Sequence, residues 1–168
     1  MNPAARDILQ RRAARYRLAP PQAVEESACA CLDLAGLELA LPLDALLACL
    51  PVSQASPLPL APRGMSGWLA HQGQALCLYD LSFLAGVRSW PADPLVALVL
   101  ELAGGRLAVA CPAAPREIAL PAAWLSEALG RAPAEGCLRR LERPDGRLLA
   151  WLDPGLLARQ MGAGFGLG

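Results

Sequence analysis

The chain has 168 residues, 55% of them hydrophobic, with 15 basic and 15 acidic side chains and a formal net charge of zero. This length and apolar content suit one compact domain. The charge balance argues against a nucleic acid or an anionic membrane as the main partner, so we expect proteins or small molecules instead.

No apolar run approaches the roughly 20 residues that a membrane-spanning helix needs, and no signal-peptide core follows the charged start of the chain. We therefore expect a cytoplasmic protein without membrane insertion. In that compartment cysteines are usually reduced. The sequence has no C-x-x-C spacing and one histidine, so we expect neither a metal site nor another cofactor. The six cysteines are Cys29, Cys31, Cys49, Cys77, Cys111 and Cys137.

Residues 3–19 carry apolar side chains at near-helical spacing among several arginines, which predicts a short basic helix. Its arginine face either is solvated or docks on a partner or membrane surface. Pro20-Pro21 cannot continue this helix. Residues 1–27 are therefore expected to form a basic helix and a linker.

Three strand pairs are predicted where alternating apolar residues flank turn sequences. They cover residues 28–43, 95–111 and 137–153, with turns at Ala35-Gly36, Ala103-Gly104-Gly105 and Arg143-Pro144-Asp145-Gly146. On the first strand, Cys29 and Cys31 share one face, and Ala30 and Leu32 share the other. These hairpins predict an all-β body.

Residues 51–86 read as a Pro- and Gly-punctuated loop that leads into a fourth strand pair bent around Gly73. A helix is expected over 121–129, with Pro121 in its first turn. We expect a flexible glycine-rich tail over 160–168. Many short strands with few helices suggest one or two small closed barrels.

The stretch "HQGQALCLYDL" at 71–81 raises the question of a catalytic Cys-His-Asp site. In the predicted strand, alternation places Cys77 and Asp80 on opposite faces, which disfavours catalysis. The structural interpretation makes His71 a solvated turn residue, Cys77 a core filler and Asp80 a capping carboxylate. Trp68 is equally typical of an interface anchor and of a partly buried core residue.

The order of motifs resembles that of the CheW family of bacterial chemotaxis coupling proteins. The residues that carry the resemblance are the strand "GLELALP" (36–42), Leu60-Ala61-Pro62, Gly67 through Gly73 to Asp80-Leu81, "GGRLAVACPAAPREIAL" (104–120) and "LLAWLDPGLLAR" (148–159). Together they cover the expected CheW-like domain, residues 28–159. The positions that match the family motifs are Gly36, Pro42, Pro62, Gly67, Asp80, Leu81 and Asp153.

This resemblance implies two five-stranded β-barrel subdomains that enclose a hydrophobic groove. It also implies a non-enzymatic adaptor that couples chemoreceptors to a CheA-type histidine kinase. The expected partners are the kinase's regulatory domain, the cytoplasmic tip of a methyl-accepting chemoreceptor and other CheW-like domains. By alignment, the partner contacts are Leu46, Ala48 and Leu50 on the strand after Pro42, and Gln72, Gly73 and Gln74 at the bend.

Several residues depart from the family pattern. Gln72 stands where the family has arginine, Cys77 where it has proline, and Cys111-Pro112 where it has Val-Asp. Replacing arginine by glutamine removes a permanent charge and a bidentate donor. A divergent member serving pilus-based motility or cell-pole organisation is therefore an alternative. A thiol enzyme or redox sensor that uses Cys77 and His71 is another.

Overall fold

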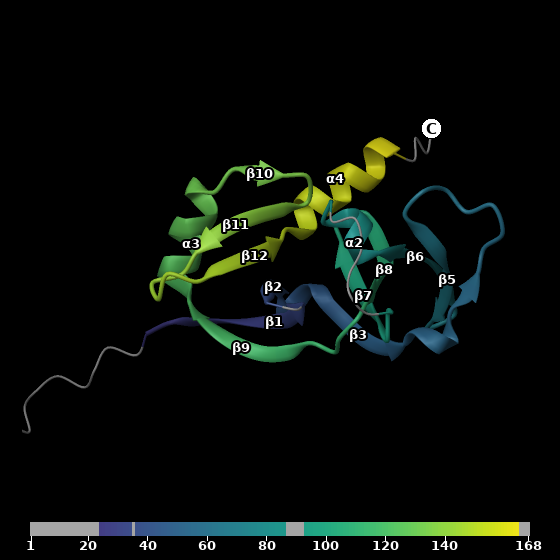
Figure 1. The fold of residues 1–168 in the computed structure, drawn as a ribbon, viewed down its shortest axis with the longest axis horizontal. Coiled ribbons are helices and arrows are strands. Elements are labelled where there is room, and N and C mark those ends of the chain that lie inside the picture. Colours follow the sequence, from purple (N-terminus) through teal and green to yellow (C-terminus); the bar gives the residue numbers. More distant parts are fainter. Residues whose placement is uncertain (1–23, 35, 87–92, 165–168) are drawn as a thin grey trace, which may run out of the picture.

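The computed structural model describes residues 24–34, 36–86 and 93–164, which form two curled β-sheets with short helices (Figure 1). The expected basic helix over 3–19 lies outside the described residues. The all-β fold predicted from the sequence is confirmed. None of the described helices is long and apolar enough to cross a membrane.

Among the described residues, sheet A has six strands in the spatial order β10-β11-β12-β2-β1-β9. Their bounds are Ala134–Glu135 (β10), Leu138–Glu142 (β11), Leu148–Leu152 (β12), Leu37–Pro42 (β2), Glu26–Leu34 (β1) and Arg116–Pro121 (β9). The first strand thus includes the last two residues of the predicted linker, 26 and 27.

Sheet B, within the same described residues, also has six strands, in the order β3-β7-β8-β6-β5-β4. Their bounds are Leu46–Pro51 (β3), Val96–Leu102 (β7), Gly105–Cys111 (β8), Gln74–Asp80 (β6), Met65–His71 (β5) and Ser56–Pro57 (β4). Because β4 and β10 have two residues each, each sheet contains five longer strands, as expected.

The two sheets repeat one pairing pattern. All four predicted hairpins form: β1 with β2, β5 with β6, β7 with β8, and β11 with β12. In each sheet a parallel pair joins two hairpins, β12 with β2 in sheet A and β6 with β8 in sheet B. Two 3-10 turns flank β3, over Leu43–Ala45 (η1) and Val52–Gln54 (η2).

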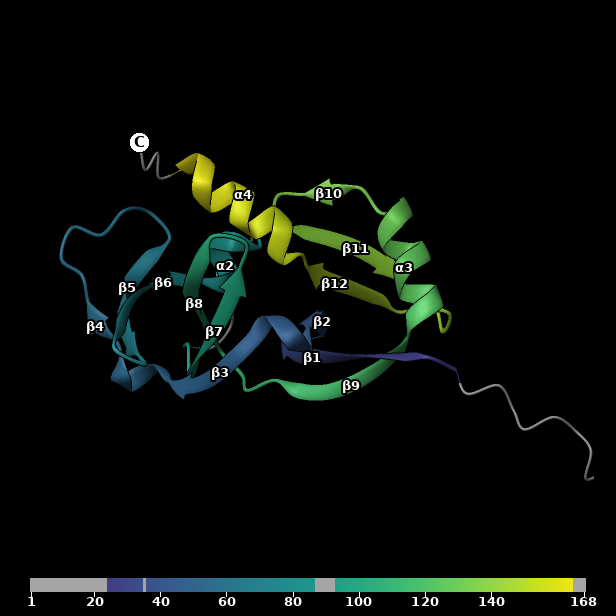
Figure 2. The ribbon, with the colours of Figure 1, turned by 180° about the vertical axis from the view of Figure 1, so that it is seen from behind.

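Helices lie at the ends of the sheets. They span Leu81–Leu84 (α2), Ala122–Arg131 (α3) and Pro154–Gly164 (α4). Both views show α4 crossing the junction between the sheets (Figures 1 and 2). Helix α4 continues to Gly164, so residues 160–164, which the sequence assigned to a glycine-rich tail, are helical. Met161 explains the difference, because it packs against the core from this last part of the helix.

Buried side chains of the described residues form three clusters. One fills the curl of sheet A under α3, and one fills the curl of sheet B. The largest lies between the sheets and takes residues from both of them and from α2 and α4. Cys29 belongs to the first cluster and Ala30 and Leu32 to the largest, so the predicted alternation holds but both faces are buried. The space between the subdomains is therefore mostly packed core.

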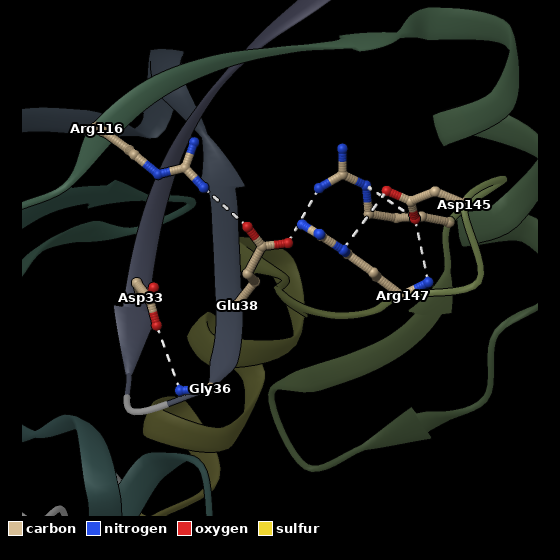
Figure 3. A network of polar contacts seen from close by, with 7 residues as sticks. Asp33, Gly36, Glu38, Arg116, Asp145 and Arg147 are labelled. Atoms are coloured by element: carbon tan, nitrogen blue, oxygen red, sulfur yellow. Dashed lines mark hydrogen bonds and ion pairs between the residues drawn. The ribbon is translucent and has the colours of Figure 1, made fainter.

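Ion pairs link strands of sheet A (Figure 3), on the face of β2 that also carries buried Ala40. On β2, Glu38 accepts hydrogen bonds from Arg116 of β9 at 2.8 Å and from Arg143 of the β11–β12 turn at 3.0 Å. Asp145 lies 3.9 Å from Arg143 and 4.0 Å from Arg147. These charges neutralise one another across strands, so the network has a structural role.

Candidate partner-binding surface

The bend at Gln72-Gly73 is a two-residue turn between β5 and β6, with His71 paired to Gln74. Gln72 has φ +49° and Gly73 has φ +77°, as a type I′ turn requires. A Cβ on Gly73 would meet no atom within 4 Å, so backbone conformation alone accounts for this glycine. The positive φ of Gln72 is unusual for a residue with a side chain.

The side chain of Gln72 contacts the neighbouring hairpin. Its Oε1 accepts a hydrogen bond from Nη1 of Arg106 at 3.2 Å. Arg106 is the second residue of β8, and its Nε lies 3.7 Å from Oε1 of Glu101 on β7. A guanidinium therefore lies beside the bend, although the family's arginine is missing from the bend itself. Sequence reasoning missed Arg106, because it lies 34 positions after Gln72 in the chain and no sequence motif links the two hairpins.

The structure does not place the predicted contacts of β3 at the surface. Leu46 is partly buried against the cluster between the sheets, and Ala48 and Leu50 are partly buried against the cluster inside sheet B. The exposed residues of β3 are the alternate ones, Leu47, Cys49 and Pro51. Direct contact of Leu46, Ala48 and Leu50 with a partner stays a prediction, and their partial burial argues against it.

A surface hollow of about 410 Å³ lies beside the bend, between β6, the β7–β8 turn and α4. We call it the α4 hollow. Its lining residues are mostly apolar and come from three separate segments: Ala75, Cys77, Tyr79, Leu102, Ala103, Gly104, Gly105, Arg106, Leu107, Ala158 and Met161. Pockets of this size and character are typical of binding sites.

The floor of the α4 hollow continues the buried core. Tyr79, which is 4% exposed, and Leu107 also belong to the cluster between the sheets. Burial raises the pKa of Tyr79 to about 12, and its neighbour Cys77 adds to the shift, so the phenol is protonated at neutral pH. Trp68 pairs across the strands with Cys77 and is 42% exposed. The apolar face of sheet B thus continues past the core into solvent.

The three residues of the suspected thiol site do not converge. Cys77 and Trp68 point outward, whereas His71 lies on the inner face of β5 together with buried Leu69. His71 is partly exposed, but its Nε2 atom is buried and has no hydrogen-bond partner among the described residues, so the side chain is less solvated than the sequence predicted. Asp80 accepts a hydrogen bond from the N–H of Ser82 at the start of α2. A thiol nucleophile needs its base within hydrogen-bond reach, and this strand pair does not bring them together.

Asp80 and Asp153 occupy matching positions at the ends of β6 and β12. Oδ1 of Asp80 accepts from the N–H of Ser82 at 2.6 Å and caps α2, as the sequence predicts. Oδ1 of Asp153 accepts from the N–H groups of Gly155 and Leu156 at 2.9 and 3.0 Å and caps α4. Leu81, directly after the first cap, is fully buried. These two aspartates anchor the helices to the sheets.

The other motif residues shape turns and strand approaches. Gly36 has φ +94° in the β1–β2 turn, and Pro42 ends β2. The carbonyl of Pro62 accepts from the N–H of Met65 at 3.0 Å and closes the turn into β5. A Cβ on Gly67 would lie 2.4 Å from the carbonyl oxygen of Ser56, so β4 could not approach β5 there. These motif positions are therefore structural in this chain.

The departure at Cys111 is also structural. This side chain is fully buried between the sheets, and burial raises the pKa of its thiol. The change from the family's valine therefore alters core packing and leaves the surface unchanged. Among the departures, Gln72 and Cys77 are the ones that modify the exposed surface near the α4 hollow.

Residues 28–161 match the family model of the CheW-like domain. The fold is similar to that of the scaffolding protein TtCheW from Thermoanaerobacter tengcongensis, with a TM-score of 0.63. That similarity covers 79% of this chain and 92% of the other, at 12% sequence identity, and it shows the shared fold alone. No curated protein matches the sequence. The family match spans most of the chain and confirms the resemblance found in the motifs: the chain belongs to the CheW-like domain family, a family of chemotaxis scaffolds.

Proposed function

We propose that the protein is a non-enzymatic adaptor that couples chemoreceptors to a CheA-type histidine kinase in chemotaxis or related motility signalling. The family match over residues 28–161 is the observation that carries this proposal. The partners would be the regulatory domain of the kinase, the cytoplasmic tip of a methyl-accepting chemoreceptor and other CheW-like domains. The protein would act in the cytoplasm, at receptor arrays on the inner membrane or at the cell pole.

The arrangement of the surface supports two separate contacts. The α4 hollow offers an apolar surface to a receptor helix. The edge strand β3 lies at the opposite end of the spatial order of sheet B from β4 and exposes Leu47 and Cys49, which suits contact with another barrel. Two partners on separate surfaces can bind at the same time, as coupling requires.

A second candidate function is a CheW-like adaptor for pilus-based motility or cell-pole organisation. The observation that favours it is the altered bend, where Gln72 replaces the family's arginine and contacts Arg106. Such a protein would bind another CheW-like domain but no chemotaxis kinase. In either case we propose residues 28–159 as the binding domain, flanked by segments 1–27 and 160–168.

Titration calorimetry tests this proposal. The protein is titrated with the regulatory domain of a CheA-type kinase from the same source, and separately with a receptor hairpin fragment. Saturable micromolar binding to both supports the coupling function. Binding to another CheW-like domain without binding to the kinase supports the second candidate, and binding to none of these partners contradicts both.

A further inference from the structure

The walls of the α4 hollow restrict what can bind there. Strand β6 already pairs with β5 on one side and β8 on the other, so its backbone has no free edge to pair with an added strand. A bound segment must therefore satisfy its own backbone hydrogen bonds. An α-helix does so internally and presents side chains to an apolar groove.

Arg106 is the one charged side chain among the described residues that line the hollow. Its guanidinium has five N–H donors. One donates to Gln72 and another faces Glu101, and no other described residue accepts a hydrogen bond from it. The side chain is 29% exposed, so its remaining donors can reach a ligand.

The bend holds this guanidinium in place. The turn conformation, with positive φ at Gln72 and Gly73, positions the amide oxygen that Arg106 contacts. An arginine at position 72 would carry no acceptor and would repel Arg106. Gln72 and Glu101 thus position a cation at the edge of an apolar surface, where a carboxylate is its matching ligand.

We propose that the α4 hollow binds one amphipathic helix, and that Arg106 selects a helix with a carboxylate beside its apolar stripe. The inference rests on the proposed coupling function, because the helix would belong to the receptor tip. It adds the specificity: Arg106, positioned by Gln72 and Glu101, is the residue that recognises the partner's acidic side chain.

Calorimetry with the receptor hairpin fragment tests the role of Arg106. We expect Arg106→Gln to weaken binding about tenfold or more, because a charge-assisted hydrogen bond is lost. Arg106→Lys keeps the charge but loses the planar guanidinium, so its affinity for the fragment should lie between those of the wild type and Arg106→Gln. Arg131→Gln is the matched control, since this arginine is 77% exposed on α3 at the far end of sheet A (Figure 1). The control should bind the fragment with the affinity of the wild type, and all variants should have the same Tm as the wild type.

Two exposed thiols report where the fragment binds. Cys77 lines the hollow, whereas Cys49 lies on β3 and is absent from the hollow's lining. A bound helix should slow alkylation of Cys77 by iodoacetamide and leave Cys49 unchanged. A fragment with one acidic residue changed to lysine should recover affinity for Arg106→Glu, which would identify the paired carboxylate.

The outcomes separate this inference from the coupling function. If the wild type binds the fragment and Arg106→Gln binds equally well, or if Cys49 is protected in place of Cys77, the inference is overturned while coupling stands. If the wild type does not bind the fragment at all, both are overturned. Reduced affinity of Arg106→Gln together with protection of Cys77 supports the inference.

Discussion

At the residue scale, strand β3 shows the difference between finding a strand and finding its exposed face. The motif alignment located this strand correctly, but a shift of one residue moves every side chain to the opposite face. A bulge in the pairing with β7, between Leu46 and Ala48, also interrupts the regular register. Leu46 therefore packs against the core while its neighbour Leu47 is 38% exposed.

This difference predicts opposite results for two adjacent substitutions. Leu46→Asp should lower the free energy of unfolding by about 3 kcal/mol or more, because a carboxylate would be placed against the core. Leu47→Asp should change it by less than about 1 kcal/mol, because its side chain reaches water. Urea denaturation measures both. Wild-type stability of Leu46→Asp would show that this side chain is at the surface, as the motif alignment alone suggests.

At the element scale, α4 depends on its first residues. The carboxylate of Asp153 caps the helix and also pairs with Nε of Arg139 on β11 at 3.0 Å. Burial opposes ionisation of this carboxyl, but the N–H donors of Leu156 and Gly155 and the Arg139 guanidinium outweigh burial and lower its pKa. Asp153 therefore connects sheet A to the helix that forms one wall of the α4 hollow.

A pH-dependent loss of stability follows for Asp153→Asn. A carboxyl whose pKa is lowered by folding stabilises the protein above its unfolded pKa, near 3.8, and this contribution disappears as pH falls through the folded value. Asparagine keeps an oxygen that can cap the helix but loses the charge-assisted bond with Arg139, so the variant should be less stable than the wild type by about 1 kcal/mol at pH 7, and the two should converge at low pH.

Urea denaturation at several pH values measures this effect. Asp33→Asn is the control, because among the described residues that carboxylate accepts one hydrogen bond, of 3.4 Å, from Gly36 in an exposed turn. At pH 7, Asp33→Asn should lower the free energy of unfolding by less than Asp153→Asn does. A stability difference for Asp153→Asn that stays constant down to low pH would contradict an ionic contribution from Asp153.

At the scale of the whole molecule, local patterns predicted more than long-range contacts did. The four hairpins follow from alternation and turn residues that lie within about 20 residues of each other. The parallel pairs of β12 with β2 and of β6 with β8 join distant segments and leave no periodic signal. Strands β4 and β10 are too short to detect. The motif resemblance supplied the architecture that local patterns could not.

The α4 hollow was unpredictable for the same reason. Its walls come from residues 75–79, 102–107 and 158–161, which meet when α4 packs across the junction of the sheets. Ala75, Cys77 and Tyr79 line the hollow from one face of β6, as strand alternation requires. The contact of Gln72 with Arg106 joins two hairpins across a sequence separation of 34 positions, so no spacing rule could reveal it.

The core between the sheets predicts that both subdomains unfold together. Leu32 and Leu39 of sheet A pack in one cluster with Leu98 and Val109 of sheet B. Separating the sheets would expose this entire apolar surface to water, and the cost rises by about 25 cal/mol per Å². Neither sheet should therefore remain folded after the other is lost.

Four buried cysteines allow a direct test of this cooperativity. Cys29 and Cys31 lie in sheet A and Cys111 in sheet B, while burial raises the pKa of Cys137 to about 11 and leaves its thiol protonated and slow to alkylate. Alkylation at increasing urea, read by mass spectrometry, should label these thiols of both sheets over the same denaturant range. Cys49 and Cys77 should react without urea. Labelling of Cys111 well before Cys29 would show that sheet B unfolds alone, and that the shared core does not couple the two halves.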